Sequence, residues 1–507
     1  MIRTAKTENG LVRGLPASDP RITSFKGIPF ALPPVGENRW RKPMPCENWE
    51  GIREAYSFGP ISMQDVPGLG DDLYCREWHV DPDIEMDEDC LYLNIWTPAK
   101  STGEKLPVLV WYFGGAFQWG YTAEMELDGE RLARRGIVVV SINYRLGAFG
   151  FLAHPQITKE QMDAPCNFGS LDQQAGLRWV KRNIAEFGGN PSNITIMGQS
   201  AGGASVMTQM ACLQNEGAFQ RAIVLSGMFR SPYRLDRLMI PKPLHEAENW
   251  GVQFFDFLGV SSLKEARELK AEYIRDKYTE FVGNHDRLTF VVDGQFLKED
   301  PYKAFIKGER VRVPVLAGNT TDEFLQGIPA ADEVELREYA EQYFGEEAHR
   351  YLSYAQARKK GAAGFGTFRD IQCGVKAAFL SESGRKDAKP CYYYRFAAEI
   401  PGEDQPGTFH SSDLWFFFET LAKCSRPYQG KHYDLARKMC HYIANFIKNG
   451  NPNGMDDDGT IMPEWRAYTD QERNEMEFSL DGPRASLEKD DFEQFLIAHV
   501  LKRETME

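Results

Sequence analysis

The sequence predicts an α/β fold in which a large, mostly parallel central sheet is flanked by helices. Short apolar runs alternate with stretches of helical spacing, as parallel strands joined by crossover helices require. The 507 residues, 42% of them apolar, are enough to bury a large core. Neither an internal repeat nor a Pro/Ser-rich linker divides the chain, so residues 1–507 are expected to form a single domain with insertions.

The predicted strands are apolar runs rich in β-branched or aromatic residues and bounded by Gly, Ser or charged residues. In chain order they cover residues 108–112, 137–142, 194–197, 222–225, 313–316 and 392–396. Between the second and third runs, residues 171–187 repeat apolar side chains at helical spacing and end at Gly188-Gly189. That stretch predicts a crossover helix.

Two later stretches, about 231–307 and 324–386, are rich in helix-forming charged residues and contain no comparable strand run. They are predicted to be helical insertions that cap a substrate cleft. Residues 433–448, followed by Asn449-Gly450, predict an amphipathic helix. The rest of the chain is expected to be a polar tail without a chemical role.

Composition argues against several classes of partner and site. The formal net charge of −14 disfavours nucleic acid and anionic membranes. The N-terminus has no apolar signal segment, and no run approaches the roughly 20 apolar residues of a membrane span. Nine scattered cysteines without a Cys-x-x-Cys pair indicate no metal site, and no cofactor is expected. Reduced thiols and the missing signal segment predict a cytoplasmic protein.

Residues 198–202, Gly-Gln-Ser-Ala-Gly, follow an apolar strand and precede a plausible helix start. This is the context of a nucleophile elbow, in which Ser200 stands in a tight turn and the glycines leave room for close backbone contacts. The amide of Ala201 would then face the developing oxyanion. Taken alone, the pattern is common enough to be an ordinary turn.

A second glycine-rich loop lies upstream, at residues 111–117, Trp-Tyr-Phe-Gly-Gly-Ala-Phe. It follows a strand, as the oxyanion loop of esterases does, so the amides of Gly115 and Ala116 are the predicted donors. The alternative is a simple turn that ends the strand. The serine motif downstream makes this alternative less favourable.

His410 is the predicted general base, because it lies in a loop of small residues late in the chain, where this order of residues places the base. For the acid, residues 319–323 directly follow a strand and end in Asp322 and Glu323. Spacing alone does not choose between these two carboxylates, and both could merely cap the next helix.

With these motifs the chain resembles the type-B carboxylesterase family of α/β-hydrolases, which includes para-nitrobenzyl esterases, liver carboxylesterases, cholinesterases and some fungal lipases. The likeness covers nearly the whole chain. Besides the elbow it rests on Phe-Lys-Gly-Ile-Pro-Phe-Ala at 25–31, Glu-Asp-Cys-Leu-Tyr-Leu-Asn at 88–94, Asn-Tyr-Arg-Leu-Gly at 143–147 and Phe-Gly-Gly-Asn-Pro at 187–191.

The resemblance implies an α/β-hydrolase fold and a catalytic triad of Ser200, Glu323 and His410. It selects Glu323 over Asp322, and it places Ser226 close to the triad as a supporting residue. Gln199, beside the serine, stands where cholinesterase-like relatives carry a glutamate, so the resemblance makes choline esters less favourable substrates.

Other departures from the family pattern concern the oxyanion loop and a disulfide. Phe113 replaces a His or Tyr, and Ala116 replaces a third glycine, so its methyl group is expected to disfavour esters of tertiary alcohols. Cys90 matches the second cysteine of an early disulfide in secreted relatives, but Ser62 stands where its partner would be. That bridge is expected to be missing.

The sequence therefore predicts a serine carboxylesterase that hydrolyses small-molecule esters, with short to medium acyl or aryl groups, through an acyl-enzyme. The alternatives are a non-catalytic adhesion relative of the same fold and an interfacial lipase. Several aromatic residues could line an apolar cleft, with core packing as the competing interpretation: Phe113, Phe117, Trp119, Tyr121 and those at 415–418. The physiological ester and the oligomeric state are left open.

Overall fold

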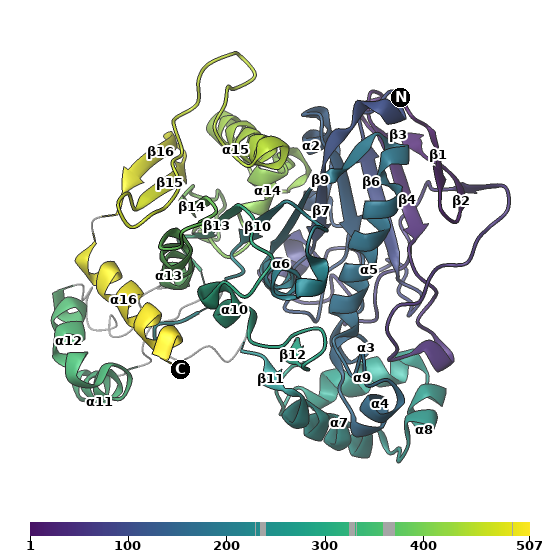
Figure 1. Cartoon of the computed structure of the whole chain (residues 1–507), viewed down its shortest axis with the longest axis horizontal. Coiled ribbons are helices and arrows are strands. Elements are labelled where there is room, and N and C mark those ends of the chain that lie inside the picture. The colour runs from purple at the N-terminus through teal and green to yellow at the C-terminus, as the bar shows by residue number, and fades with distance from the viewer. Residues whose placement is uncertain are drawn as a thin grey trace.

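The computed structural model describes residues 1–228, 230–233, 240–323, 330, 332–357, 371–488 and 490–506. Its main feature is an 11-stranded sheet in the order β16-β15-β14-β13-β10-β9-β7-β8-β6-β4-β3 (Figure 1). From one edge to the other the strands are β16 (Gly482–Leu487), β15 (Asn474–Ser479), β14 (Cys391–Phe396), β13 (Val315–Thr320), β10 (Arg221–Leu225), β9 (Gly189–Gln199), β7 (Leu106–Tyr112), β8 (Val138–Ile142), β6 (Tyr92–Thr97), β4 (Thr23–Pro29) and β3 (Leu15–Pro16).

Neighbouring strands from β15 to β8 run parallel, and the strands at both edges are antiparallel. All six strands predicted from sequence lie in this parallel part. Two small sheets accompany it: β1 (Thr4–Thr7), β2 (Gly10–Arg13) and β5 (Ile52–Glu54) form one, and β11 (Lys242–Pro243) and β12 (Val291–Val292) form the other.

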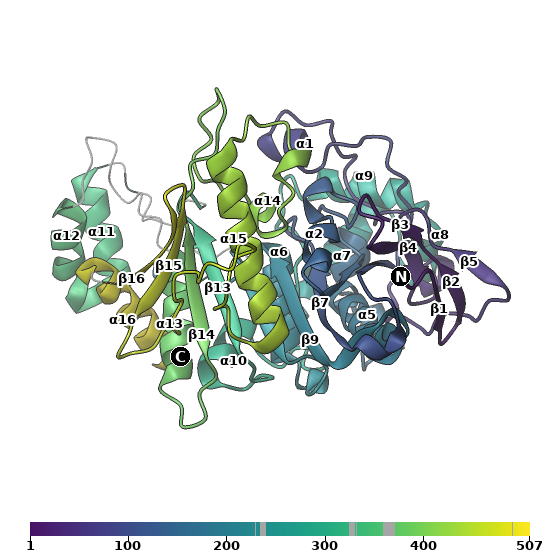
Figure 2. The ribbon, with the colours of Figure 1, turned by 90° about the horizontal axis from the view of Figure 1, so that it is seen from above.

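Helices cover both faces of the sheet (Figure 2). In the first half of the chain they are α1 (Leu73–Glu77), α2 (Glu130–Arg134), α3 (Gly147–Phe151), α4 (Pro155–Glu160), α5 (Phe168–Asn183), α6 (Ala201–Ala211), α7 (Leu244–Leu258) and α8 (Leu263–Glu268). The later helices are α9 (Ala271–Phe281), α10 (Pro301–Lys307), α11 (Glu333–Phe344), α12 (Ala348–Ala357), α13 (Ile371–Ser383), α14 (Leu414–Phe417), α15 (Gly430–Asn449) and α16 (Asp491–Met506).

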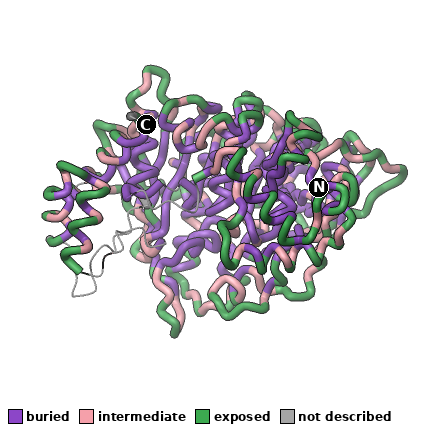
Figure 3. Tube along the Cα trace, turned by 90° about the horizontal axis from the view of Figure 1, so that it is seen from below, coloured by how far each residue is buried: buried purple, intermediate pink, exposed green. Residues whose placement is uncertain are grey.

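The alternation of side chains along each strand divides the core between the two faces of the sheet. In β7, Leu109 and Trp111 pack in the cluster that contains residues of α15, whereas Val108 and Val110 pack in the cluster that contains residues of α5 and α6. Because successive strand residues point to opposite faces, one apolar run serves both layers. Figure 3 shows the buried residues gathered along these central strands.

The described parts of the two predicted insertions are mostly helical, with the short strands β11 and β12 in the first, and they lie at different places. The first contains α7 to α10. The second contains α11 and α12, which lie beyond the β16 edge of the sheet (Figures 1 and 2), and α13, which packs against β13 and β14. Residues 234–239 of the first insertion, and 324–329, 331 and 358–370 of the second, lie outside the described residues.

The expectation of a polar tail after residue 450 is wrong. Strand β15 pairs in parallel with β14, β16 pairs with β15, and α16 packs against α13. Phe478 and Leu496 in this region are fully buried. Because the segment contains many charged residues, its short, half-buried elements were not recognised from the sequence. Their apolar positions contact the core only in the folded chain.

Strand register brings three chain segments to one edge of the sheet. Gln199 at the end of β9 pairs with Leu225 of β10, and Leu225 pairs with Gly318 of β13. The residues that follow these strands therefore emerge side by side at the carboxyl ends of parallel strands, where α/β folds place their sites.

Candidate active site

Ser200 occupies a strained turn between β9 and α6, with φ of 55° and ψ of −122°. The flanking glycines are a steric requirement of this turn. A Cβ on Gly198 would lie 2.1 Å from the carbonyl oxygen of Gly202, and a Cβ on Gly202 would lie 2.1 Å from that of Tyr112. The strand–turn–helix context predicted for residues 198–202 is present, and Ser200 lines a pocket with 9% of its surface exposed.

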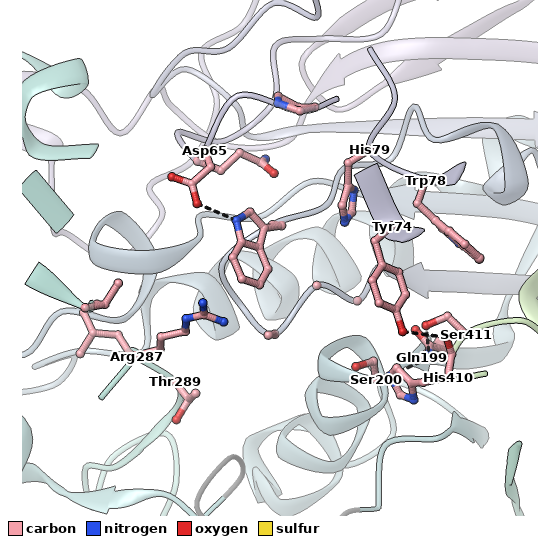
Figure 4. A pocket seen from close by; sticks show the side chains of 18 of the residues that line it. Asp65, Tyr74, Trp78, His79, Gln199, Ser200, Arg287, Thr289, His410 and Ser411 are labelled. Atoms are coloured by element: carbon pink, nitrogen blue, oxygen red, sulfur yellow. Dashed lines mark hydrogen bonds between the residues drawn. The ribbon is translucent and has the colours of Figure 1, made fainter. Parts of the chain in front are cut away.

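His410 and Glu323 meet although they lie far apart in the chain. Nδ1 of His410 is 2.5 Å from Oε2 of Glu323, and the other carboxylate oxygen of Glu323 accepts a hydrogen bond of 3.1 Å from the amide of Thr320. His410 lines the same pocket as Ser200, and Figure 4 shows their side chains next to each other.

Asp322 has a different place from its neighbour. Its Oδ2 accepts a 2.6 Å hydrogen bond from the amide of Thr408, and its own amide donates to the carbonyl of Thr408. Asp322 thus ties the loop after β13 to the loop that carries His410, while Glu323 contacts the imidazole itself. The structure therefore separates the two carboxylates that spacing alone left equivalent.

The surroundings of Glu323 favour its ionised form. Burial by itself would raise its pKa, but the charge of His410 and its hydrogen bond, together with the nearby Ser226 hydroxyl and the Thr320 amide, outweigh burial and lower the pKa. The side chain of Ser226 is fully buried. Ser226 therefore lies beside Glu323.

Gln199 contacts the imidazole from the other side. Its Nε2 lies 3.2 Å from Nε2 of His410 and donates a 2.8 Å hydrogen bond to the hydroxyl of Ser411. An amide nitrogen is a donor only, so the contact is favourable when Nε2 of His410 is unprotonated and Nδ1 carries the proton toward Glu323.

The glycine-rich loop after β7 is built from left-handed backbone. The φ angles of Gly115, Ala116 and Phe117 are 102°, 54° and 63°. Within the described part of the chain, the amides of Gly115, Ala116 and Ala201 donate to no other group. Gly115 and Ala116 line the same pocket as Ser200, and Ala201 directly follows Ser200 at the start of α6.

The pocket is a cavity of about 1100 Å³. Its walls combine residues of the first predicted insertion, including Trp250 and Phe290, with Tyr74 and Trp78 from the region of α1. Among the described residues of 324–386, none lines it, so the expectation that both insertions flank the cleft is wrong for the described part of the second.

Most of the aromatic residues proposed for the cleft belong to the core. Trp119 lines the pocket, whereas the buried cluster on the α15 side contains Phe113, Phe117 and the aromatic residues 415–418. Phe113 stacks on Tyr144 with ring centroids 4.3 Å apart. Tyr121 is buried as well. Core packing, the competing interpretation, describes all of these side chains except Trp119.

Sequence reasoning missed several polar residues of this region. The hydroxyl of Tyr74 donates a 3.0 Å hydrogen bond to the backbone oxygen of His410, and His79 pairs with Glu124 on the pocket wall. Asp413 is fully buried near Glu323 and His410 and accepts a 2.7 Å hydrogen bond from Tyr394. Only Asp413, three residues after His410, had a sequence signal that could have singled it out.

Two groups of acidic and histidine side chains are close enough to hold a metal ion, among the described residues. In one, Lys376 already binds all three glutamates, which are Glu475, Glu488 and Glu493. In the other, Arg437 pairs with Asp456. Neither group lines the pocket.

Comparison with known proteins decides the family. The sequence model of the carboxylesterase family matches residues 2–495, nearly the whole chain. The chain belongs to the carboxylesterase family. This carboxylesterase is thereby a carboxylic ester hydrolase with the α/β-hydrolase fold, as the resemblance implied.

Named relatives agree with the family. The carboxylesterase is 31% identical to para-nitrobenzyl esterase of Bacillus subtilis (strain 168) over 93% of both chains. It is 33% identical to fumonisin B1 esterase of Sphingopyxis macrogoltabida over 83% of this chain and 75% of that one. It is 32% identical to cholinesterase of Mus musculus over 90% of this chain and 80% of that one.

Solved structures show the same architecture. A carboxylesterase of Geobacillus stearothermophilus superposes with a TM-score of 0.77 at 30% identity, covering 98% of this chain and all of the other. A PNB esterase superposes with a TM-score of 0.79 at 26% identity, covering 98% and 99%. None of the helices in the described part of the carboxylesterase has the length and apolar character to cross a membrane.

Proposed function

We propose that this carboxylesterase hydrolyses short to medium acyl or aryl esters through an acyl-enzyme on Ser200, with His410 as general base and Glu323 as the orienting acid. The observation that carries the proposal is the 2.5 Å contact between Nδ1 of His410 and Glu323, in a pocket that His410 shares with Ser200. A proton held at Nδ1 leaves Nε2 to accept the proton of the serine hydroxyl.

The chemical steps follow from this arrangement. As Ser200 attacks the ester carbonyl, His410 takes its proton and then transfers it to the departing alcohol. The amides of Gly115, Ala116 and Ala201 stabilise the negative oxygen of the tetrahedral intermediate, each contributing on the order of 3 kcal/mol. Water repeats the sequence on the acyl-enzyme.

The test is hydrolysis of para-nitrophenyl acetate, butyrate, octanoate and palmitate by the wild type, Ser200→Ala and Ser192→Ala. Ser192 is an exposed serine and serves as the matched control. We expect Ser200→Ala to lose roughly 10,000-fold or more in kcat, while Ser192→Ala behaves like the wild type. Equal background rates for the wild type and Ser200→Ala would instead favour a non-catalytic binding relative.

An interfacial lipase is the second candidate, because apolar side chains are exposed where the pocket opens. Leu69, Ile240 and Val66 line the pocket with exposed fractions of 72%, 48% and 38%. A higher rate on emulsified long-chain triglyceride than on soluble para-nitrophenyl butyrate would favour the lipase.

We further propose a reducing compartment, the cytoplasm, as the location. All nine cysteines are free. Burial raises the pKa of the Cys90 thiol, and the Ser62 hydroxyl beside it acts in the opposite direction. Ser62 therefore stands next to Cys90, which supports the missing bridge. Fractionation of cells that make the protein would test the location.

A further inference from the structure

The pocket contains a second histidine–carboxylate pair apart from His410 and Glu323. Nδ1 of His79 lies 2.6 Å from Oε1 of Glu124, and both residues line the pocket. The Glu124 side chain is 5% exposed and that of His79 is 17% exposed. Figure 4 shows the ring of His79 reaching into the pocket from the same segment as Tyr74 and Trp78.

This pair holds His79 as a donor. Burial would lower the pKa of His79, but the charge of Glu124, the hydrogen bond to it and the charge of Asp72 outweigh burial and raise the pKa. Burial and the charge of Glu124 raise the pKa of the neighbouring Glu126. The raised pKa favours the charged imidazole, in which Nδ1 donates to Glu124 and Nε2 carries a second N–H. That second N–H has no partner among the described residues.

The other carboxylates of the pocket wall are already engaged. Asp65 accepts hydrogen bonds from Trp119 and Thr279, and Asp72 caps the N-terminus of α1. Asp286 pairs with Lys242 at 2.8 Å. The described acidic side chains of the pocket therefore all have hydrogen-bond or ion-pair partners within the protein.

Among the described residues that line the pocket, Arg287 is a cation without an ion pair. Its guanidinium lies 4.5 Å above the ring of Trp119, and it forms no ion pair with a described carboxylate. The stacking directs the guanidinium over the pocket wall while leaving its N–H groups for a ligand. His79 and Arg287 thus have unused N–H donors, whereas the described carboxylates of the pocket already have partners. This arrangement favours an anionic rather than a cationic substrate group.

We propose that this pocket selects esters that carry a carboxylate away from the reacting carbonyl, with His79 as the specificity-determining residue and Arg287 as a weaker, more exposed contributor. This inference rests on the proposed esterase function, because it assigns the substrate class of the same pocket.

The test compares esters that differ by one carboxylate. Mono-para-nitrophenyl adipate against para-nitrophenyl hexanoate places the charge on the acyl side, and 4-acetoxybenzoate against phenyl acetate places it on the alcohol side. For each pair we define the charge ratio as kcat/KM of the charged ester over that of the neutral one. His79→Gln removes a charge-assisted hydrogen bond to the substrate carboxylate, so we expect it to lower this ratio about tenfold in at least one pair. Arg287→Gln should lower the ratio less, because Arg287 is more exposed.

A matched control comes from the same wall. His285 also lines the pocket but stacks on Phe281, so His285→Gln should leave the ratio within about twofold. An unchanged ratio in His79→Gln for both ester pairs would overturn the proposal. A wild-type preference for butyrylcholine over butyl butyrate that falls in Glu124→Gln would also overturn it.

A binding experiment separates this inference from the proposed reaction. Calorimetric titration of Ser200→Ala with monomethyl adipate requires no turnover. Binding that is weakened about tenfold or more in Ser200→Ala/His79→Gln supports the anion site even if no ester is hydrolysed, in which case the proposed reaction alone fails. Equal binding by the two proteins would contradict the anion site even where hydrolysis is observed.

Discussion

The carboxylate of Glu323 and the imidazole of His410 are 87 positions apart in the chain and 2.5 Å apart in space. The two loops that carry them are joined a second time, by Asp322 and Thr408. The Asp322–Thr408 contact therefore anchors the loop of His410 beside Glu323. Because the anchoring contact and the charge on the imidazole belong to different residues, their effects can be tested separately.

Glu323→Gln should lower kcat by roughly 100- to 10,000-fold, because a neutral amide neither fixes the imidazole tautomer nor stabilises its charged form. Asp322→Asn is the matched control. Its remaining carbonyl oxygen can still accept from the Thr408 amide, so we expect a loss of less than about tenfold. Steady-state kinetics on para-nitrophenyl butyrate measures both. Equal losses would mean that loop anchoring, and not the acid, limits the rate.

Asp413 should make the stability of the fold depend on pH. Burial raises the pKa of Asp413 to about 7, with the hydrogen bond from Tyr394 opposing and the charge of Glu323 adding to the shift. Between the unfolded value, about 4, and about 7, the folded chain binds more protons than the unfolded chain. Its contribution to stability is therefore present at low pH and lost as pH rises through about 7.

Asp413→Asn removes this titration while keeping an acceptor for Tyr394. From pH 5 to pH 8, the free energy of unfolding of the variant should increase relative to that of the wild type by roughly a few kcal/mol. Urea unfolding at the two pH values measures the difference, and the exposed Asp470→Asn serves as the control. A difference that stays constant with pH would show that Asp413 is ionised throughout.

Ala116→Gly should open the pocket to esters of tertiary alcohols. The methyl group of Ala116 stands in the glycine-rich loop after β7 at φ of 54°, a conformation that glycine adopts without strain. We expect the ratio of kcat/KM for tert-butyl acetate over n-butyl acetate to rise about tenfold or more in the variant. If the wild type already hydrolyses both acetates at comparable rates, the methyl group does not restrict the pocket.

Lys376→Met should destabilise the fold strongly. The Lys376 ammonium is buried and binds Glu475 of β15 at 2.6 Å and Glu493 of α16 at 2.7 Å. Without it, buried carboxylates would face one another, at a loss of about 3 to 5 kcal/mol in the free energy of unfolding.

Lys307→Met is the control for that substitution, because Lys307 pairs with Glu299 in a half-exposed position and should matter by about 1 kcal/mol or less. Urea unfolding at neutral pH compares the two variants. Similar losses would indicate that the three glutamates become protonated when the lysine is removed.

The elbow was predictable because its requirements are local. A turn with φ of 55° at Ser200 leaves no room for a Cβ at Gly198 or Gly202, so the residue types themselves report the geometry. The parallel strands were predictable for a similar reason, since residues buried on both faces must be apolar without interruption.

Other features of the structure left little or no trace in the sequence. Glu475 and Glu493 look like residues of a solvated tail, and only Lys376 on a distant helix makes them part of the core. The pairing of His79 with Glu124 joins residues 45 positions apart and follows no spacing rule.

By itself, the sequence determined the strand–turn–helix around Ser200, the parallel sheet and the set of residues from which a triad could be drawn. These features depend on steric and burial requirements that each residue meets within its own segment. Only the tertiary structure decided that Glu323 and not Asp322 meets His410, that α11 and α12 lie away from the pocket, and which donors remain unpaired on its wall. Those outcomes depend on contacts between segments that are distant in the chain, and such contacts form only when the whole chain packs.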